Sequence, residues 1–320
     1  MNAGSTLLLT LALGLGATAA QADEAAQCAT VKLADPGWSD IASTNAIARL
    51  LLENLGYQVK IDSLAVPIIY GGLKDGKVDA FLGNWMPAQQ GFYDKFVASG
   101  QVQQLSRNLD GTEFTLAVPE YVWQAGVKDF ADLHKHADRF GQKLYGISAG
   151  SPANLSLKEI IDNDDFALGK WKLVESSEQA MLTQVDRAVK GKKFIAFLGW
   201  TPHPMNVQLK MRYLTGGEKW FGGKGQVHTL VRNGYAEQCP NPAKLLGNLS
   251  FTLDMENAIM AEAVEQKVSF DVAAKHWVKA HPEVLDAWLA GVTRKAGGDG
   301  LAGVTRKAGG DGLSAVKSAL

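Results

Sequence analysis

Short apolar segments that end in a tryptophan alternate along this chain with helix-forming segments, and this alternation limits the folds that the chain can adopt. Two of these segments, "AFLGNW" at 80–85 and "AFLGW" at 196–200, are nearly identical. Strands that alternate with helices are typical of βαβ units, in which parallel strands form a sheet and helices cover both of its faces. The sequence therefore predicts an α/β protein with a parallel sheet.

The strand and helix patterns form two blocks. The first runs to residue 113, and the second begins with the apolar segment "FTLAVP" at 114–119. A chain of 320 residues is long enough for two domains. We expect the C-terminal third to return to the first block, so that one lobe comprises 23–113 plus 212–320 and the other 114–211. Two crossings between the lobes would form a hinge.

The N-terminus has the pattern of an export signal. An apolar stretch begins at Leu7 and ends in small residues at Ala20-Gln21-Ala22, which is typical of a signal peptide cleaved after residue 22. The alternative is a buried core helix. Export predicts a periplasmic protein, and in an oxidising compartment the two cysteines, Cys28 and Cys239, indicate one disulfide. The alternative for the cysteines is two separate buried thiols.

Composition and motifs argue against several classes of function. The formal net charge is −1, and no basic stretch carries interleaved aromatic residues, so nucleic acid is not an expected partner. The six histidines show no metal-binding spacing, and His-Glu-x-x-His does not occur. We expect neither a metal nor a cofactor, and no enzymatic activity.

Three tryptophans occupy comparable positions at the predicted strand ends: Trp38, Trp85 and Trp200. In open α/β sheets, ligands bind beyond the carboxyl ends of the strands. Two of these residues belong to the first block and one to the second, so they would face one another across a cleft, where Phe114 could complete an aromatic box. Indole faces attract cations, and quaternary ammonium groups suit them best. For a single tryptophan, the alternative is a packing residue in the core.

Three polar residues near these tryptophans have two interpretations each. Asp40 could balance the charge of a cation or accept a hydrogen bond from a ligand hydroxyl, or it could cap the following helix. Asn154 could reach the polar end of a ligand or cap its own helix. His203 could be a general base, but two flanking prolines stiffen the chain there and favour a structural role.

The tryptophans lie within longer motifs, which are "ADPGWSD", "GKVDAFLGNWMP", "VESSEQAMLTQV", "FLGWTPHPMN", "VHTLVRNGY" and "NLSFTLDMENAIM". Together, from about residue 30 to 290, they resemble the choline-binding proteins of bacterial ABC importers, within the glycine betaine/choline substrate-binding superfamily. The resemblance implies a type II periplasmic binding fold, whose two lobes close on the ligand.

The resemblance also implies roles for individual residues. Trp38, Trp85 and Trp200 match the box for the trimethylammonium group, and Asp40 and Asn154 match the positions that hold the choline hydroxyl. The fourth box position is a tyrosine in choline binders, and here it matches Phe114, which keeps the aromatic face and loses the hydroxyl. The family further implies a disulfide between the N-terminal region and the C-terminal part of the chain, consistent with Cys28 and Cys239.

We therefore expect a periplasmic receptor that captures choline, or a close quaternary ammonium compound, for an importer permease in the inner membrane. Such receptors are monomers by default, and we expect a monomer here. The first alternative is a glycine betaine or carnitine receptor of the same fold, although Asp40 would repel a ligand carboxylate. The second is a periplasmic hydrolase of choline esters with His203 as its base. A perfect 12-residue repeat, 289–300 and 301–312, indicates only a duplication tolerated in the tail.

Overall fold

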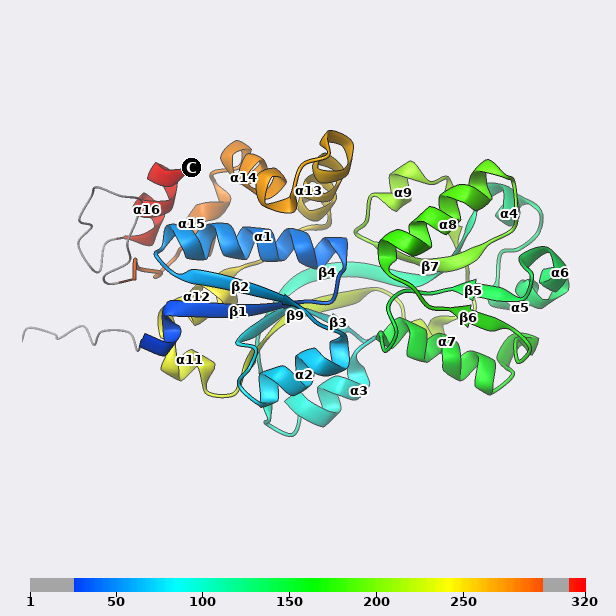
Figure 1. The fold of residues 1–320 in the computed structure, drawn as a ribbon, viewed down its shortest axis with the longest axis horizontal. Coiled ribbons are helices and arrows are strands. Elements are labelled where there is room, and N and C mark those ends of the chain that lie inside the picture. The colour runs from blue at the N-terminus through cyan, green and yellow to red at the C-terminus, as the bar shows by residue number, and fades with distance from the viewer. Residues whose placement is uncertain (1–25, 296–310) are drawn as a thin grey trace, which may run out of the picture.

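The computed structural model describes residues 26–295 and 311–320, which form two α/β lobes side by side (Figure 1). The predicted signal peptide lies outside the described residues, and so does most of the 12-residue repeat. Within the described part of the chain, no helix combines the length and the hydropathy that crossing a membrane requires.

Nine strands lie in one continuous series across both lobes, in the order β2-β1-β3-β9-β4-β7-β5-β6, with β8 paired to β4. The strands are β1 (Thr30–Asp35), β2 (Gln58–Ser63), β3 (Ala80–Met86), β4 (Val102–Pro119), β5 (Lys143–Tyr145), β6 (Lys172–Val174), β7 (Ala196–Thr201), β8 (Met211–Tyr213) and β9 (Gly225–Arg232).

The sheet is mixed, which corrects the expectation of a purely parallel sheet. Strand β1 runs parallel to β2 and β3, and β5 runs parallel to β6 and β7, as βαβ units require. The strands that connect the lobes run the other way: β4 is antiparallel to β7, β8 and β9, and β9 is antiparallel to β3. Each lobe is thus a parallel unit closed by antiparallel strands, and the predicted α/β class is confirmed.

Strand β4 crosses from one lobe to the other without a break. Its residues 102–112 pair with β9 in the first lobe, and its residues 113–119 pair with β7 and β8 in the second. In Figure 1, β4 runs as one long ribbon across the waist of the molecule. The expected boundary between 211 and 212 falls within β8, whose partner is the second-lobe part of β4.

Helices cover both faces of each lobe. Around the first lobe lie α1 (Ser39–Asn54), α2 (Val66–Lys74), α3 (Gln90–Phe92), α11 (Tyr235–Gln238), α12 (Pro240–Asn248), α13 (Leu253–Gln266), α14 (Phe270–Ala280), α15 (Val284–Trp288) and α16 (Gly312–Ala319). Around the second lie α4 (Glu120–Gln124), α5 (Phe130–Leu133), α6 (Ala137–Phe140), α7 (Pro152–Asp162), α8 (Glu178–Lys190), α9 (Met205–Gln208) and α10 (Glu218–Phe221). The return of the chain to the first lobe places α13 and α14 against α1.

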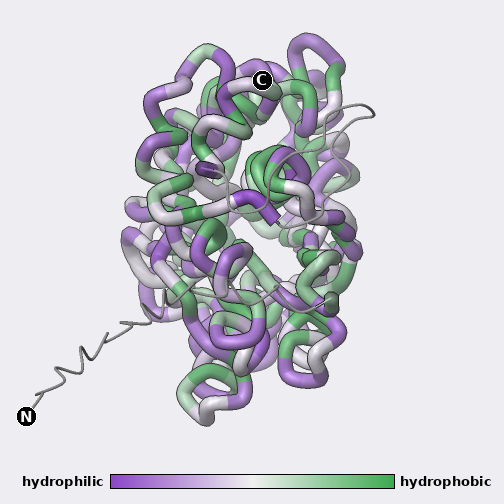
Figure 2. Tube along the Cα trace, turned by 90° about the vertical axis from the view of Figure 1, so that its left-hand side faces the viewer, coloured by the Kyte–Doolittle hydropathy of each residue, from purple (hydrophilic) through white to green (hydrophobic). Residues whose placement is uncertain are grey.

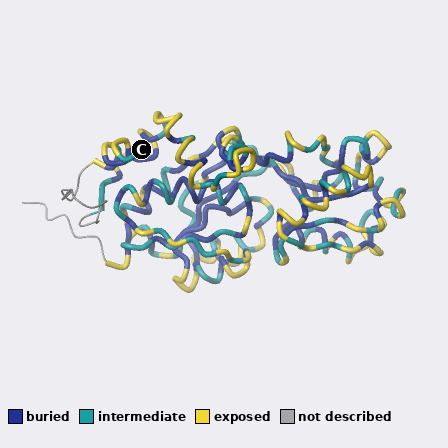
Figure 3. Tube along the Cα trace, turned by 45° about the horizontal axis from the view of Figure 1, so that its top comes forward, coloured by how far each residue is buried: buried dark blue, intermediate teal, exposed yellow. Residues whose placement is uncertain are grey.

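The core of each lobe lies between its strands and these helices. Figure 3 shows the buried residues concentrated on the strands, with the exposed residues on outer turns and loops. In the view along the long axis, the surrounding helical coils mix hydrophobic and hydrophilic residues, as expected for helices that bury one face (Figure 2). Cys28 and Cys239 form a disulfide with their Cα atoms 5.5 Å apart, which confirms the predicted bond.

Candidate functional site

The backbone brings the three strand-end tryptophans toward the space between the lobes. Trp38 follows β1 and occupies the N-cap position of α1, after a turn in which Gly37 has a φ of +83°. A side chain at Gly37 would be strained in this left-handed conformation. Trp85 and Trp200 are the penultimate residues of β3 and β7, and Phe114 pairs with Trp200 across β4 and β7.

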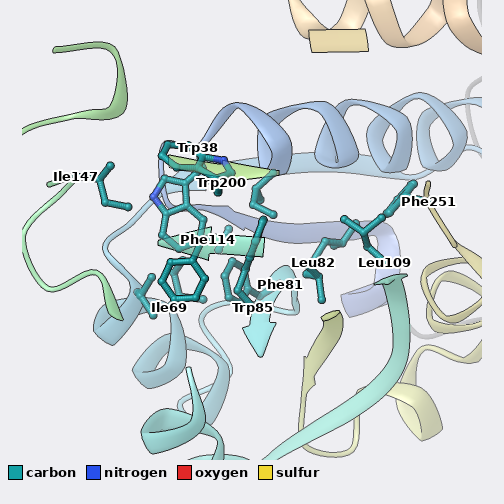
Figure 4. Close-up of a cluster of buried hydrophobic side chains, with 14 of the residues drawn as sticks. Trp38, Ile69, Phe81, Leu82, Trp85, Leu109, Phe114, Ile147, Trp200 and Phe251 are labelled. Carbon is teal, nitrogen blue, oxygen red and sulfur yellow. The ribbon is translucent and has the colours of Figure 1, made fainter. Parts of the chain in front are cut away.

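These four aromatic residues line a single cavity between the lobes (Figure 4). Trp38 and Trp85 come from the first lobe, and Phe114 and Trp200 from β4 and β7 in the second. All four are at most 9% exposed. The Phe114 ring is perpendicular to that of Trp85, with their centroids 6.4 Å apart. The structure therefore brings the three tryptophans and Phe114 together around one cavity, as the sequence predicts.

Asp40 also lines the cavity, and it does not cap a helix. The N-cap position of α1 belongs to Trp38, and no side chain caps the helix there, so the capping interpretation of Asp40 is wrong. Its Oδ2 accepts a hydrogen bond from Trp85 Nε1 at 3.0 Å. Its Oδ1 is buried without a hydrogen-bond partner among the described residues. A buried acceptor without a donor is costly, so this atom is available to a ligand.

The electrostatic environment of the cavity favours a cation. Burial, with a smaller contribution from the charge of Glu178, raises the pKa of Asp40 to about 8, although the hydrogen bond from Trp85 lowers it. Burial also raises the pKa of Asp35 and that of Glu256, and the charge of Asp40 adds to the effect on Glu256. Among the described residues that line the cavity there is no lysine or arginine. A cationic ligand would stabilise these carboxylates in their charged form.

Asn154 is placed next to the cavity but does not line it. Its Oδ1 accepts a hydrogen bond from the Ile147 amide at 3.0 Å, and its Nδ2 donates to the Ile147 carbonyl at 2.7 Å and to Glu175 Oε1 at 3.0 Å. The helix is capped by Ser151, whose Oγ accepts from the Asn154 amide. The side chain of Asn154 therefore holds the loop before α7 in place, and a direct contact with a ligand stays a prediction.

Sequence reasoning missed several lining residues. Ile147, Ser151, Pro152 and Ala153 bring the N-terminus of α7 to the cavity. The glycine loop before this helix was the available signal, but it did not single out these residues. The prediction also omitted Ala88, Leu198 and Gln89, of which Gln89 is polar. It is fully buried, and its Nε2 donates to the Gly83 carbonyl at 2.7 Å, which fixes the backbone close to Trp85.

His203 is 5% exposed and does not line the cavity. Its Nδ1 accepts a hydrogen bond from the Met205 amide, and its Nε2 lies 3.1 Å from Glu178 Oε1. Ser39 Oγ donates to the same Glu178 atom. In a hydrolase triad the histidine lies between the serine and the carboxylate, whereas here the carboxylate lies between the other two. This arrangement does not activate Ser39, and the described residues contain no cluster of metal-ligating side chains.

Comparisons with known proteins agree with this geometry. The family model described as the substrate-binding domain of ABC-type glycine betaine transport systems matches residues 29–280. The chain is 42% identical to a solved ABC-transporter choline-binding protein in complex with choline, over 92% of this chain and 98% of that one, with a TM-score of 0.86. It is 25% identical to lactococcal OpuAC in its closed-liganded conformation with glycine betaine, over 81% of this chain and 98% of that one, with a TM-score of 0.74.

One curated relative aligns over a smaller part of the chain. The glycine betaine/carnitine transport binding protein GbuC of Listeria monocytogenes is 31% identical over 160 residues. This alignment covers 50% of the present chain and 53% of GbuC, so the chain spans about half the length of that relative.

Proposed function

The chain belongs to the family of substrate-binding domains of ABC-type glycine betaine transport systems, and we propose that it captures choline, or a close quaternary ammonium compound, for import. The observation that carries this proposal is the apolar cavity walled by Trp38, Trp85, Phe114 and Trp200, with Asp40 at its side. The binding step requires no chemistry on the ligand.

The aromatic walls suit a trimethylammonium group for two reasons. A quaternary ammonium ion has no N–H to donate, so hydrogen-bond acceptors cannot recognise its cationic head. The faces of indole and phenyl rings supply both electrostatic attraction and contact with the methyl groups. Each desolvated cation–π contact contributes about 2 kcal/mol, so several such contacts together support micromolar binding.

Asp40 favours choline over a zwitterionic ligand. Its unpartnered Oδ1 can accept a hydrogen bond from the choline hydroxyl, and its negative charge offsets that of the cation. A ligand carboxylate in the same place would be repelled. Glycine betaine is the second candidate, because the relatives above include a glycine betaine complex and because an Asp40 with a pKa of about 8 can carry a proton at neutral pH. In that form it would donate to a ligand carboxylate.

The pairing of the strands supports a division into two lobes that close on the ligand. We place the first crossing within β4, near residue 113, and the return between β8 and β9, somewhat later than the boundary expected at 212. Ligand binding favours the closed arrangement, because the box is complete only when the walls from both lobes meet.

The cellular setting is part of the proposal. Residues 1–22 would direct export to the periplasm, where the Cys28–Cys239 bond is stable. The closed, loaded receptor acts as a monomer and presents its cargo to the permease of an ABC importer in the inner membrane.

The first test is calorimetric titration of the exported protein with choline, acetylcholine and glycine betaine. We expect choline to bind and Trp200→Ala to abolish measurable binding, because the variant removes one wall of the box. Trp123→Ala is the matched control, since Trp123 lies in α4 and does not line the cavity. Choline affinity that survives Trp200→Ala would contradict the aromatic box, and heat from glycine betaine alone would favour the second candidate.

A further inference from the structure

A buried carboxylate of the second lobe meets the first turn of a helix of the first lobe. Glu178, the first residue of α8, is 2% exposed, and Ser39 is the first residue of α1. Glu178 Oε2 accepts a hydrogen bond from the Ser39 backbone amide at 3.0 Å, and its Oε1 accepts another from Ser39 Oγ. Two hydrogen bonds therefore join the lobes through a single carboxylate.

The second lobe holds this carboxylate in place from its own side. His203 Nδ1 accepts a hydrogen bond from the Met205 amide at 3.0 Å, so the ring proton lies on Nε2, which donates to Glu178 Oε1 at 3.1 Å. The N-termini of α1 and α8 both lie at this point, and their partial positive charges favour a carboxylate. Burial of the charge is thereby compensated by three donors and two helix ends.

The residues that make this connection are neighbours of the cavity walls. Ser39 lies between Trp38 and Asp40 in the chain, and the centroid of the His203 ring is 4.9 Å from that of Trp200, with an angle of 67° between the rings. Movement of the walls toward a ligand therefore also moves Ser39 toward Glu178. In Figure 1, α1 and α8 flank the gap between the lobes on the side opposite to α2 and α7.

We propose that Glu178 is a closure latch, a positioning residue whose hydrogen bonds to Ser39 form when the lobes close and hold the ligand without touching it. Glu178 is not among the residues that line the cavity, so it acts on affinity through the closed arrangement and through its charge near Asp40, and only the first of these is shared with Ser39. The inference rests on the proposed function in one respect, namely that the lobes close on a ligand.

The test combines affinity with a direct measure of closure. Spin labels at Val207→Cys in α9 and Val264→Cys in α13 report the separation of the lobes, because these side chains are 88% and 53% exposed and lie on different lobes. The two native cysteines are paired with each other, so they do not compete for the label. Calorimetry with choline supplies the affinity.

We expect Glu178→Gln to weaken choline binding by about tenfold or more, because glutamine carries no charge and offers one acceptor oxygen where the three donors now meet two. The distances between the labels should shift to longer values, with and without choline. Ser39→Ala keeps the backbone amide and should give a smaller shift in the same direction. Asp186→Asn is the matched control, since Asp186 lies on the same helix and its exposed side chain is paired with Lys190.

Each outcome decides a separate question. Unchanged affinity and unchanged distances in Glu178→Gln would overturn the latch. If the wild-type protein binds no choline, the proposed function fails, while the distances in the unliganded variants still decide whether the latch exists. Should Glu178→Gln fail to fold, Ser39→Ala carries the same two measurements. In the double variant Glu178→Gln/Ser39→Ala, the losses of choline affinity should be less than additive, because both substitutions act on the same contact between Glu178 and Ser39.

Discussion

At the scale of single residues, the cavity combines aromatic walls with one carboxyl group whose ionisation depends on the ligand. Asp40 is 1% exposed; its Oδ2 accepts a hydrogen bond from Trp85, and its Oδ1 has no hydrogen-bond partner within the described part of the chain. The charges of Glu178 and, to a smaller extent, Asp35 act on Asp40 and disfavour its ionisation in the absence of a cation. A cation in the box therefore does more than fill a cavity, because it stabilises the charged form of a group that burial keeps protonated.

The raised pKa of Asp40 predicts opposite pH dependences for the stability of the unliganded protein and for its affinity for choline. Its pKa is raised from 3.8 to about 8, so its contribution to the stability of the unliganded protein is fully present below pH 3.8 and is lost as the pH rises through about 8. Choline affinity should rise over the same interval, by up to about tenfold per pH unit, because the cation favours the carboxylate. Calorimetry at several pH values between 5 and 9 measures this dependence.

The control for this prediction is Asp40→Asn, which should bind more weakly and lose most of the pH dependence. The other carboxyl groups remain in that variant, so any dependence that persists belongs to them. A wild-type affinity that is constant from pH 5 to pH 9 would contradict the role given to Asp40.

At the scale of elements, the position of the loop before α7 depends on a side chain that does not itself line the cavity. Asn154 is fully buried and satisfies both backbone polar groups of Ile147, which does line the cavity. Asn154 thus holds the loop at Ile147, which precedes α7, in its position at the cavity.

Asn154→Ala should lower the free energy of unfolding by about 1–3 kcal/mol, because it leaves buried backbone groups without partners. It should also weaken choline binding, since the Ile147 loop is no longer held. Chemical denaturation and calorimetry measure the two effects. Asn163→Ala, at the exposed C-terminal end of the same helix, is the control. Loss of binding with unchanged stability would instead indicate that Asn154 contacts the ligand directly.

At the scale of the whole molecule, the disulfide connects positions 211 residues apart in the sequence. The chain-entropy model assigns a loop of this length about 4–5 kcal/mol at most. The double variant Cys28→Ser/Cys239→Ser should therefore lose several kcal/mol in chemical denaturation.

Choline affinity of the double variant should remain within about twofold of wild type, because neither cysteine lines the cavity and both belong to the first lobe. A loss of stability below 1 kcal/mol would show that the bond constrains the unfolded chain far less than the loop model requires. A large loss of affinity would show that the bond also orders the site.

The sequence by itself determined the α/β class, the alternation of strands and helices and the strand-end positions of Trp38, Trp85 and Trp200, because these follow from local periodicity. It did not reveal that β4 begins at Val102: residues 102–112 are mixed in burial, and their partner β9 lies more than a hundred residues away.

Only the tertiary structure decided the partners of the polar side chains. Asp40 bonds to Trp85, 45 residues away, instead of capping α1, and Glu178 meets Ser39, 139 residues away. Asn154 bonds to the loop before its own helix, although its type and position suited other roles equally well. The physical reason is the same in each case. Local sequence sets the periodic burial of a backbone segment, whereas a hydrogen bond between side chains depends on which segments the fold brings within 3 Å or so of each other.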